Sequence, residues 1–70
     1  MDENKFNELR AEAGDIVCYR SSFGTLYYYL VEGYEYEHEV DIRNYRVIAM
    51  HDGGRHSGVF MSKTVYEVVA

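Results

Sequence analysis

The stretch Leu26–Val40, which reads LYYYLVEGYEYEHEV, constrains the fold of this chain more than any other segment. Every residue of Leu26–Val31 is apolar or aromatic, so a strand here would have two apolar faces, both of which should be covered. A short apolar run also fits a buried helix, but its length, its tyrosine content and the flanking Gly24 and Gly33 favour a strand.

Beyond Gly33 the sequence alternates between two kinds of side chain. One face of a strand would carry Tyr34, Tyr36, His38 and Val40, and the opposite face would carry Glu35, Glu37, Glu39 and Asp41. In a helix Glu35 and Glu39 would repel each other at positions i and i+4, so we predict that residues 34–41 are extended. Gly33 predicts a bulge or sharp bend, which would allow one long strand to turn the corner of a small barrel.

The length and composition indicate one small folded domain that spans residues 1–70. Its 8 tyrosines can supply much of a small core if their hydroxyls reach water. Cys18 is the single cysteine, so no internal disulfide can form, and this is typical of a reducing compartment. The chain shows no signal peptide and no transmembrane run, and we therefore expect a cytoplasmic protein.

The remaining elements are predicted from local patterns. Residues 1–13 predict a short helix, because Phe6, Leu9 and Ala13 form one apolar stripe and Gly14 follows it. Further strands are expected at 15–20, 45–50, 58–61 and 65–69. Turns are expected at 21–25, where Phe23 would be exposed, and at 51–54, where Asp-Gly-Gly is a strong hairpin signal; residues 41–44 read as a connection, and 62–64 as a single helical turn.

Five short strands with tight turns predict an all-β fold, a small closed barrel. The segment Gly58–Val69 resembles the end of a Src-homology-3 domain, where a hairpin strand, a one-turn helix with Ser and a final Tyr/Val strand follow one another. Gly14–Val17 is similar to the first strand of such barrels. The resemblance covers about a third of the chain and implies a five-stranded Src-homology-3-like barrel. It does not extend to PxxP binding, because the Ala-Leu-Tyr-Asp-Tyr start and the groove tryptophan are missing and Met61 stands where the groove's proline would be.

Catalytic and metal-binding patterns are missing from the sequence, and we expect no enzyme activity and no cofactor. The chain has no GxSxG elbow, no Walker loop and no GxGxxG. Cys18 lies in an apolar strand, where a thiol is usually inert. His51, Asp52 and His56 surround a hairpin turn, but two histidines and one carboxylate are more typical of a solvated turn than of a zinc site, so we predict no metal site.

A nucleic-acid site is the alternative function that the sequence offers. Aromatic rings flanked by arginines can stack on single-stranded bases, and the candidates are Arg20, Arg43, Arg46, Arg55 and Tyr45. The net charge of −5 argues against nucleic acid as the main partner. Tyr45 packed in the sheet with Arg46 on a solvated face is the competing interpretation.

The acidity of the chain is local, and this motivates the main hypothesis. Five of the 12 carboxylates lie in residues 32–41 without a Lys or Arg, whereas acids and bases outside that window number 7 each. We expect a non-enzymatic protein-binding module, such as a phage or bacterial accessory or inhibitor protein, in which acids and tyrosines dock a basic protein surface: Glu35, Glu37, Glu39, Asp41, Tyr34 and Tyr36. Carboxylates along a strand repeat about every 6–7 Å, so the face could mimic nucleic acid. A merely solubilising face that protects a strand edge, and self-association through an uncovered edge, stay open.

Overall fold

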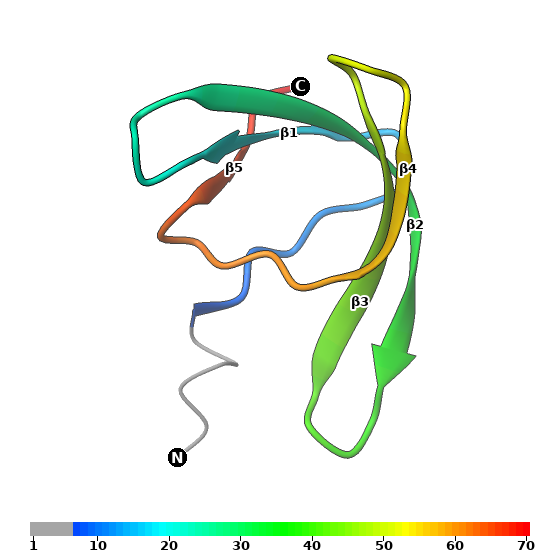
Figure 1. Ribbon diagram of the computed structural model, residues 1–70. Helices are drawn as coiled ribbons and strands as arrows, with labels where there is room; N and C mark the ends of the chain where they lie inside the picture. Colours follow the sequence, from blue (N-terminus) through cyan, green and yellow to red (C-terminus); the bar gives the residue numbers. More distant parts are fainter. Residues whose placement is uncertain (1–6) are drawn as a thin grey trace.

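The computed structural model describes residues 7–70, and they form an all-β domain, as predicted. The strands are β1 (Ile16–Arg20), β2 (Leu26–Glu37), β3 (Ile42–Ala49), β4 (Arg55–Val59) and β5 (Tyr66–Val68). They form one antiparallel sheet with the order β4-β3-β2-β1-β5, which curves strongly around its core (Figure 1). Within the described residues the edge strands β4 and β5 do not pair with each other, so the sheet is open and the closed barrel predicted from the sequence is not what these pairings form.

Strand β2 is the long central strand, and it is irregular where Gly33 predicts a bulge. Its register against β3 shifts between Val31 and Gly33, so Glu32 is the extra residue on β2. A Cβ at Gly33 would lie 2.5 Å from Arg46 Nη2, because the Arg46 guanidinium passes over this position. The bulge divides β2 into a first half that pairs with β1 and β3 and a second half that pairs with β3 alone.

The core lies on one face of the curved sheet. Its fully buried apolar side chains come from β1, β2, β3, the segment before β1 and the connection between β4 and β5: Ala11, Val17, Val31, Tyr45, Val47, Ala49 and Met61. Partly buried Leu9, Tyr29, Tyr34, Val59 and Tyr66 pack against this cluster. The outward positions between these inward residues leave the opposite face of the sheet without a layer over it in the described chain.

The helix predicted for residues 1–13 is wrong for residues 8–13, and the part in residues 1–6 lies outside the described residues. Residues 7–13 form an arm that crosses the core face of the sheet (Figure 1). The Leu9 amide donates to the Met61 carbonyl at 2.8 Å, and Glu8 forms an isolated bridge with Ser62. The apolar stripe is narrow, so pairing with the β4–β5 connection satisfies the arm better than a helix would.

The predicted turns at 21–25 and 51–54 are confirmed, and the single helical turn predicted at 62–64 is a turn without a helix. Ser21–Thr25 is closed by the Ser21 amide donating to the Thr25 carbonyl, and Phe23 at its tip is 93% exposed. The Asp-Gly-Gly turn joins β3 to β4, with the Gly53 amide donating to the Ala49 carbonyl. Between β4 and β5 the Ser62 carbonyl accepts from the Val65 and Tyr66 amides in a single turn.

Strands β3 and β4 begin earlier than expected. Residues 42–44, expected as a connection, belong to β3, and β4 begins at Arg55 instead of Gly58. Gly58 has a φ of +71° and lies where β4 carries an extra residue against β3, so this glycine permits a bulge in place of a strand start.

Candidate functional site

The predicted acidic face is present over a shorter length than expected. Register places Tyr34 opposite the buried Tyr45, so Tyr34 and Tyr36 lie on the arm side while Glu35 and Glu37 point outward. Glu35 forms an ion pair with Arg46, and Glu37 accepts a hydrogen bond from Asn44 Nδ2 at 3.1 Å. The outward carboxylates of β2 are therefore partly compensated by β3.

The strand predicted to continue to Asp41 ends at Glu37, so Glu39 and Asp41 do not extend the acidic strand face. Residues 38–41 form a turn, in which the Asp41 amide donates to the Glu37 carbonyl at 2.8 Å and Asp41 has a φ of +56°. Asp41 accepts from the Tyr36 hydroxyl and lies 3.7 Å from Arg10 Nη2. The turn forms because β3 must return antiparallel to β2, and an aspartate tolerates the left-handed backbone better than most residues.

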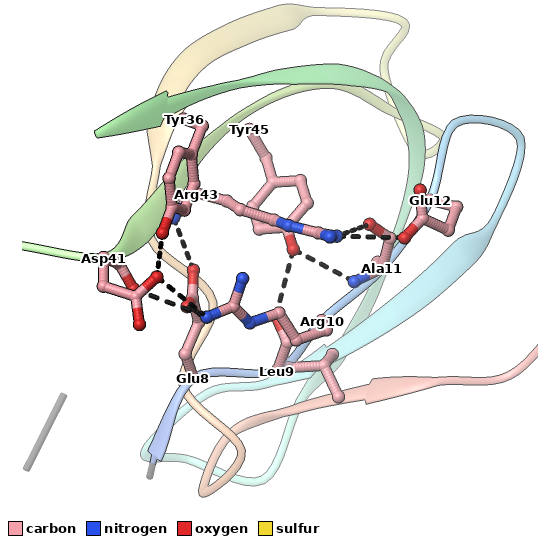
Figure 2. Close-up of polar contacts among 9 residues, drawn as sticks. All are labelled: Glu8, Leu9, Arg10, Ala11, Glu12, Tyr36, Asp41, Arg43 and Tyr45. Carbon is pink, nitrogen blue, oxygen red and sulfur yellow. Dashed lines mark hydrogen bonds and ion pairs between the residues drawn. The ribbon is translucent and has the colours of Figure 1, made fainter. Parts of the chain in front are cut away.

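A buried carboxylate anchors the arm to the start of β3 (Figure 2). Glu8 is 1% exposed, and its Oε2 accepts from the Arg43 amide at 2.6 Å. Its Oε1 lies 3.2 Å from Arg10 Nη2, so the buried charge has a cationic partner. Sequence reasoning missed Glu8, because nothing in the local pattern distinguishes it from a solvated acid.

Tyr45 and Arg43 complete this polar network (Figure 2). The Tyr45 hydroxyl accepts from the Ala11 amide at 3.0 Å and donates to the Leu9 carbonyl at 3.2 Å. Arg43 Nη1 donates to the Ala11 carbonyl at 2.8 Å and to Glu12 at 3.1 Å, while the Arg43 guanidinium lies 4.0 Å from the centre of the Tyr34 ring. These groups are occupied with each other, so the network holds the arm in place and does not form an open site.

The residues of the nucleic-acid hypothesis are not brought together into one surface. Tyr45 is fully buried, so its ring cannot stack on a base, and Arg43 is committed to the arm. Arg46 pairs with Glu35, and Arg20 Nη2 donates to the Thr64 carbonyl at 3.2 Å. Arg55 is largely exposed, 3.9 Å from Glu32. All five candidates thus make contacts within the protein or lie beside an acid, and they come from β1, β3 and β4.

An uncovered apolar surface, which we name the outer face, is the most prominent exposed feature. It is formed by the outward positions of β1, of the first half of β2, of β3 and of the residues that follow β3 and β5: Ile16, Cys18, Leu26, Tyr28, Leu30, Ile48, Met50 and Val69. Leu26 and Met50 are 51% and 54% exposed, and Tyr28 is 43% exposed. A shallow groove of about 380 Å³ lies between Ile16, Tyr28, Met50 and Val69, and Tyr27 and His51 also line it.

The outer face corrects one expectation from the sequence. The apolar run Leu26–Val31 predicts that both faces of β2 are covered, but only the face with Tyr29 and Val31 packs on the core. The sequence correctly predicts that the second face of β2 is apolar. The expectation that this face is covered is wrong, because the described chain provides no second layer.

The side chains of His51, Asp52 and His56, at and after the turn between β3 and β4, are not arranged as metal ligands. His51 Nε2 lies 3.7 Å from Asp52 Oδ2, and His56 faces Tyr29 with ring centres 6.2 Å apart. Within residues 7–70 no group of three or more His, Cys, Asp and Glu side chains is placed to hold a metal ion. Cys18 is a free, half-buried thiol on the outer face.

Comparison with known proteins adds no relative, since no protein family, curated protein or solved structure matches the chain. In the described residues no helix is both long and apolar enough to cross a membrane.

Proposed function

We propose that this protein is a non-enzymatic protein-binding module built on a Src-homology-3-like barrel, and that its outer face docks a partner with a basic rim around an apolar centre. Three features support the proposed barrel type: the strand order β4-β3-β2-β1-β5, a long β2 bent at Gly33, and the single turn at Ser62 between β4 and β5. The arrangement of strands does not determine what a domain binds, so the proposed function depends on the residues of the surface.

The exposed apolar outer face carries the proposal. Contiguous exposed apolar patches on a protein surface often mark interaction sites. Tyr28 lies near the centre of the face, opposite Cys18 in β1 and next to Met50, and tyrosine is enriched among the residues that anchor interfaces.

Charge supports a basic partner. The chain carries a net charge of −5, and the exposed Glu35, Glu37 and Glu39 belong to its acidic window. In this proposal the acids accelerate association with a basic surface, and the apolar outer face supplies the affinity.

The proposal is tested by capturing partners from a native lysate with the wild-type protein and with a double variant, Tyr28→Ser with Met50→Ser. Val40→Ser is the matched control, because Val40 is 47% exposed but lies in the turn between β2 and β3. We expect the double variant to lose the captured protein and the control to retain it. Equal capture by all three proteins would refute docking through the outer face.

Light scattering on the eluted wild-type protein separates a foreign partner from self-association. A monomer that captures a basic protein supports the proposal. A stable dimer that Tyr28→Ser dissociates would mean that the outer face binds a second copy instead.

A further inference from the structure

Six aromatic rings form a continuous series of contacts that the proposed docking through the outer face does not use. The series, which we name the aromatic strip, runs through Tyr66, Tyr19, Tyr27, His51, Tyr29 and His56. Neighbouring ring centres are 4.9–6.5 Å apart, within the range of aromatic pairs. The rings come from β5, β1, β2, β4 and the turn between β3 and β4, so the sheet aligns residues that are far apart in the sequence.

The strip lies on the core side of the sheet, opposite the outer face. Tyr19 is opposite Tyr27 and Tyr66 in the strand register, and Tyr29 is opposite the buried Val17. Because side chains alternate across a strand, Tyr27 faces the strip while its neighbour Tyr28 faces outward. The two faces meet at the groove beside Met50, which Tyr27 and His51 line together with Tyr28, so separate variants of Tyr27 and Tyr28 are needed to distinguish the faces.

The strip is accessible at its edges and holds polar groups without partners in the described chain. Its four tyrosines are half-buried, its two histidines are exposed, and Val68, which shares this side of β5, is 38% exposed. The hydrogen bonds of residues 7–70 include none from these four tyrosine hydroxyls, and none of these oxygens is buried without a partner. The hydroxyls are therefore free to bind a ligand or water.

Charge at the strip favours a cation. Among the described residues the one arginine stacked on a ring is Arg43, which covers Tyr34 in the network around the arm and leaves the strip uncovered. The Asp52 carboxylate lies beside His51, and burial together with Tyr19, Tyr27 and Asp52 raises the pKa of Tyr29 above its ordinary value. Aromatic faces, phenolic oxygens and a nearby carboxylate together match a cationic ligand.

We propose that the aromatic strip binds an arginine side chain of the basic partner; this inference rests on the proposed function. A guanidinium is planar and weakly hydrated, so it stacks on tyrosine faces, and its five N–H donors match the phenolic oxygens and Asp52. A lysine ammonium retains its water more strongly and stacks less well. Single-stranded bases also stack on aromatic rings, but the acidic charge of the chain opposes a phosphate backbone.

The experiment uses short peptides, so it does not depend on identifying the partner. The ¹⁵N-labelled protein is titrated by NMR with acetyl-Gly-Arg-Gly-amide, with the lysine peptide, and with the citrulline peptide, which is the neutral isostere of arginine. We expect the arginine peptide to shift the resonances of Tyr19, Tyr27 and His51 and to bind at least about fivefold more tightly than the citrulline peptide, since one cation–π contact is worth about 1 kcal/mol. Equal shifts by arginine and citrulline would overturn the inference.

Adjacent variants assign the binding to one face. Tyr27→Leu is expected to weaken arginine binding about fivefold and Tyr27→Phe to retain most of it, because phenylalanine keeps the ring face. Tyr28→Leu, on the opposite face, should leave peptide binding unchanged. If Tyr27→Leu does not fold, the comparison of wild type with citrulline and the Tyr27→Phe titration still decide the question.

The two proposals fail in distinguishable ways. The Tyr28 and Met50 variant could lose partner capture while the wild type shows no arginine-specific shift. That result would support docking through the outer face and overturn arginine binding by the aromatic strip. An arginine-specific shift, together with capture that does not depend on the outer face, would support the aromatic strip as an arginine site and overturn docking through the outer face. If oligo(dT) shifts the strip resonances and the arginine peptide does not, the strip stacks bases and the arginine proposal is wrong.

Discussion

The Tyr45 hydroxyl is the group whose removal most directly tests how the arm is attached. Tyr45 is fully buried, and its hydroxyl accepts from the Ala11 amide and donates to the Leu9 carbonyl. Replacement by phenylalanine keeps the ring and its packing but removes both hydrogen bonds. Any loss of stability can therefore be attributed to polar groups of the arm.

The loss of stability expected for Tyr45→Phe depends on the two backbone groups that lose their hydrogen-bond partner. Ala11 is 1% exposed, so its amide would be buried without an acceptor, at a cost of about 1–3 kcal/mol. Leu9 is only partly buried, and its carbonyl can recover a bond to water, which keeps its share near the lower end of that range. We expect Tyr45→Phe to lower the free energy of unfolding by about 2–3 kcal/mol, a large part of the roughly 4–10 kcal/mol available to a domain of this size.

Urea unfolding followed by tyrosine fluorescence measures this change. For a slope of about 1–2 kcal/mol per molar urea, the midpoint should fall by about 1–3 M. Tyr28→Phe is the matched control, because Tyr28 is exposed and no hydrogen bond from its hydroxyl is found in the described residues; its midpoint should move little. Hydrogen exchange adds a local readout: the Ala11 amide should lose protection before the amides of β3.

A Tyr45→Phe protein as stable as the wild type, with the Ala11 amide still protected, would refute this reasoning. It would mean that the arm is held by the apolar contacts of Leu9 and Ala11 and by Glu8, and that the hydroxyl is incidental. A loss of stability shared equally by Tyr28→Phe would instead point to a general effect of removing tyrosine hydroxyls.

Three further predictions concern the arm, the bulge and the tyrosines. Glu8→Gln should lower the free energy of unfolding by about 2–3 kcal/mol, because Arg10 and the Arg43 amide lose a buried carboxylate. Glu12→Gln is the control: the Glu12 carboxylate that binds Arg43 is exposed, so its loss should cost less than about 1 kcal/mol in the same urea assay. Gly33→Ala should cost less than about 1 kcal/mol, since the added methyl group meets only the flexible end of Arg46 and displaces an exposed ion pair with Glu35. Gly58→Ala should cost about 1–2 kcal/mol because Gly58 has a φ of +71°. Equal effects of the two substitutions in thermal unfolding would contradict the assignment of the two bulges. Burial raises the pKa of Tyr29 and of Tyr66 above the ordinary 10.0, so the folded protein holds these protons more tightly than the unfolded chain. The contribution of these two tyrosines to stability should be constant below pH 10 and fall above it. Absorbance at 295 nm should show late-titrating tyrosines that Tyr29→Phe and Tyr66→Phe remove.

Much of the sheet was predictable because its signals are local. The apolar run of Leu26–Val31, the Asp-Gly-Gly turn and the bulge at Gly33 each depend on a few neighbouring residues and elementary backbone geometry. The separation of Tyr34 and Tyr36 from Glu35 and Glu37 likewise follows from alternation. These features lie where local preference and the final fold agree.

The arm and the acidic turn were not predictable for the opposite reason, since they depend on contacts across the chain. Glu8 meets Arg43 across 35 positions, and Ala11 meets Tyr45 across 34. A local stripe of Phe6, Leu9 and Ala13 cannot reveal that Leu9 pairs with Met61. The alternation of residues 34–41 continues past Glu37, but the chain must reverse there so that β3 can cover β2, and the reversal removes Glu39 and Asp41 from the strand face.

The outer face follows from a limit on how a chain of this size can cover itself. All five strands lie in one sheet, and the arm covers the core side, where Val17, Val31 and Met61 are already buried. A β2 that is apolar on both sides therefore leaves Leu26 and Tyr28 toward water, although polar residues there would serve the fold equally well. Residues that the fold does not require and that raise the risk of aggregation are most readily explained by a partner that covers them. The aromatic strip lies on the other side of the same strand, so in our two proposals the adjacent Tyr27 and Tyr28 contact the partner in different ways.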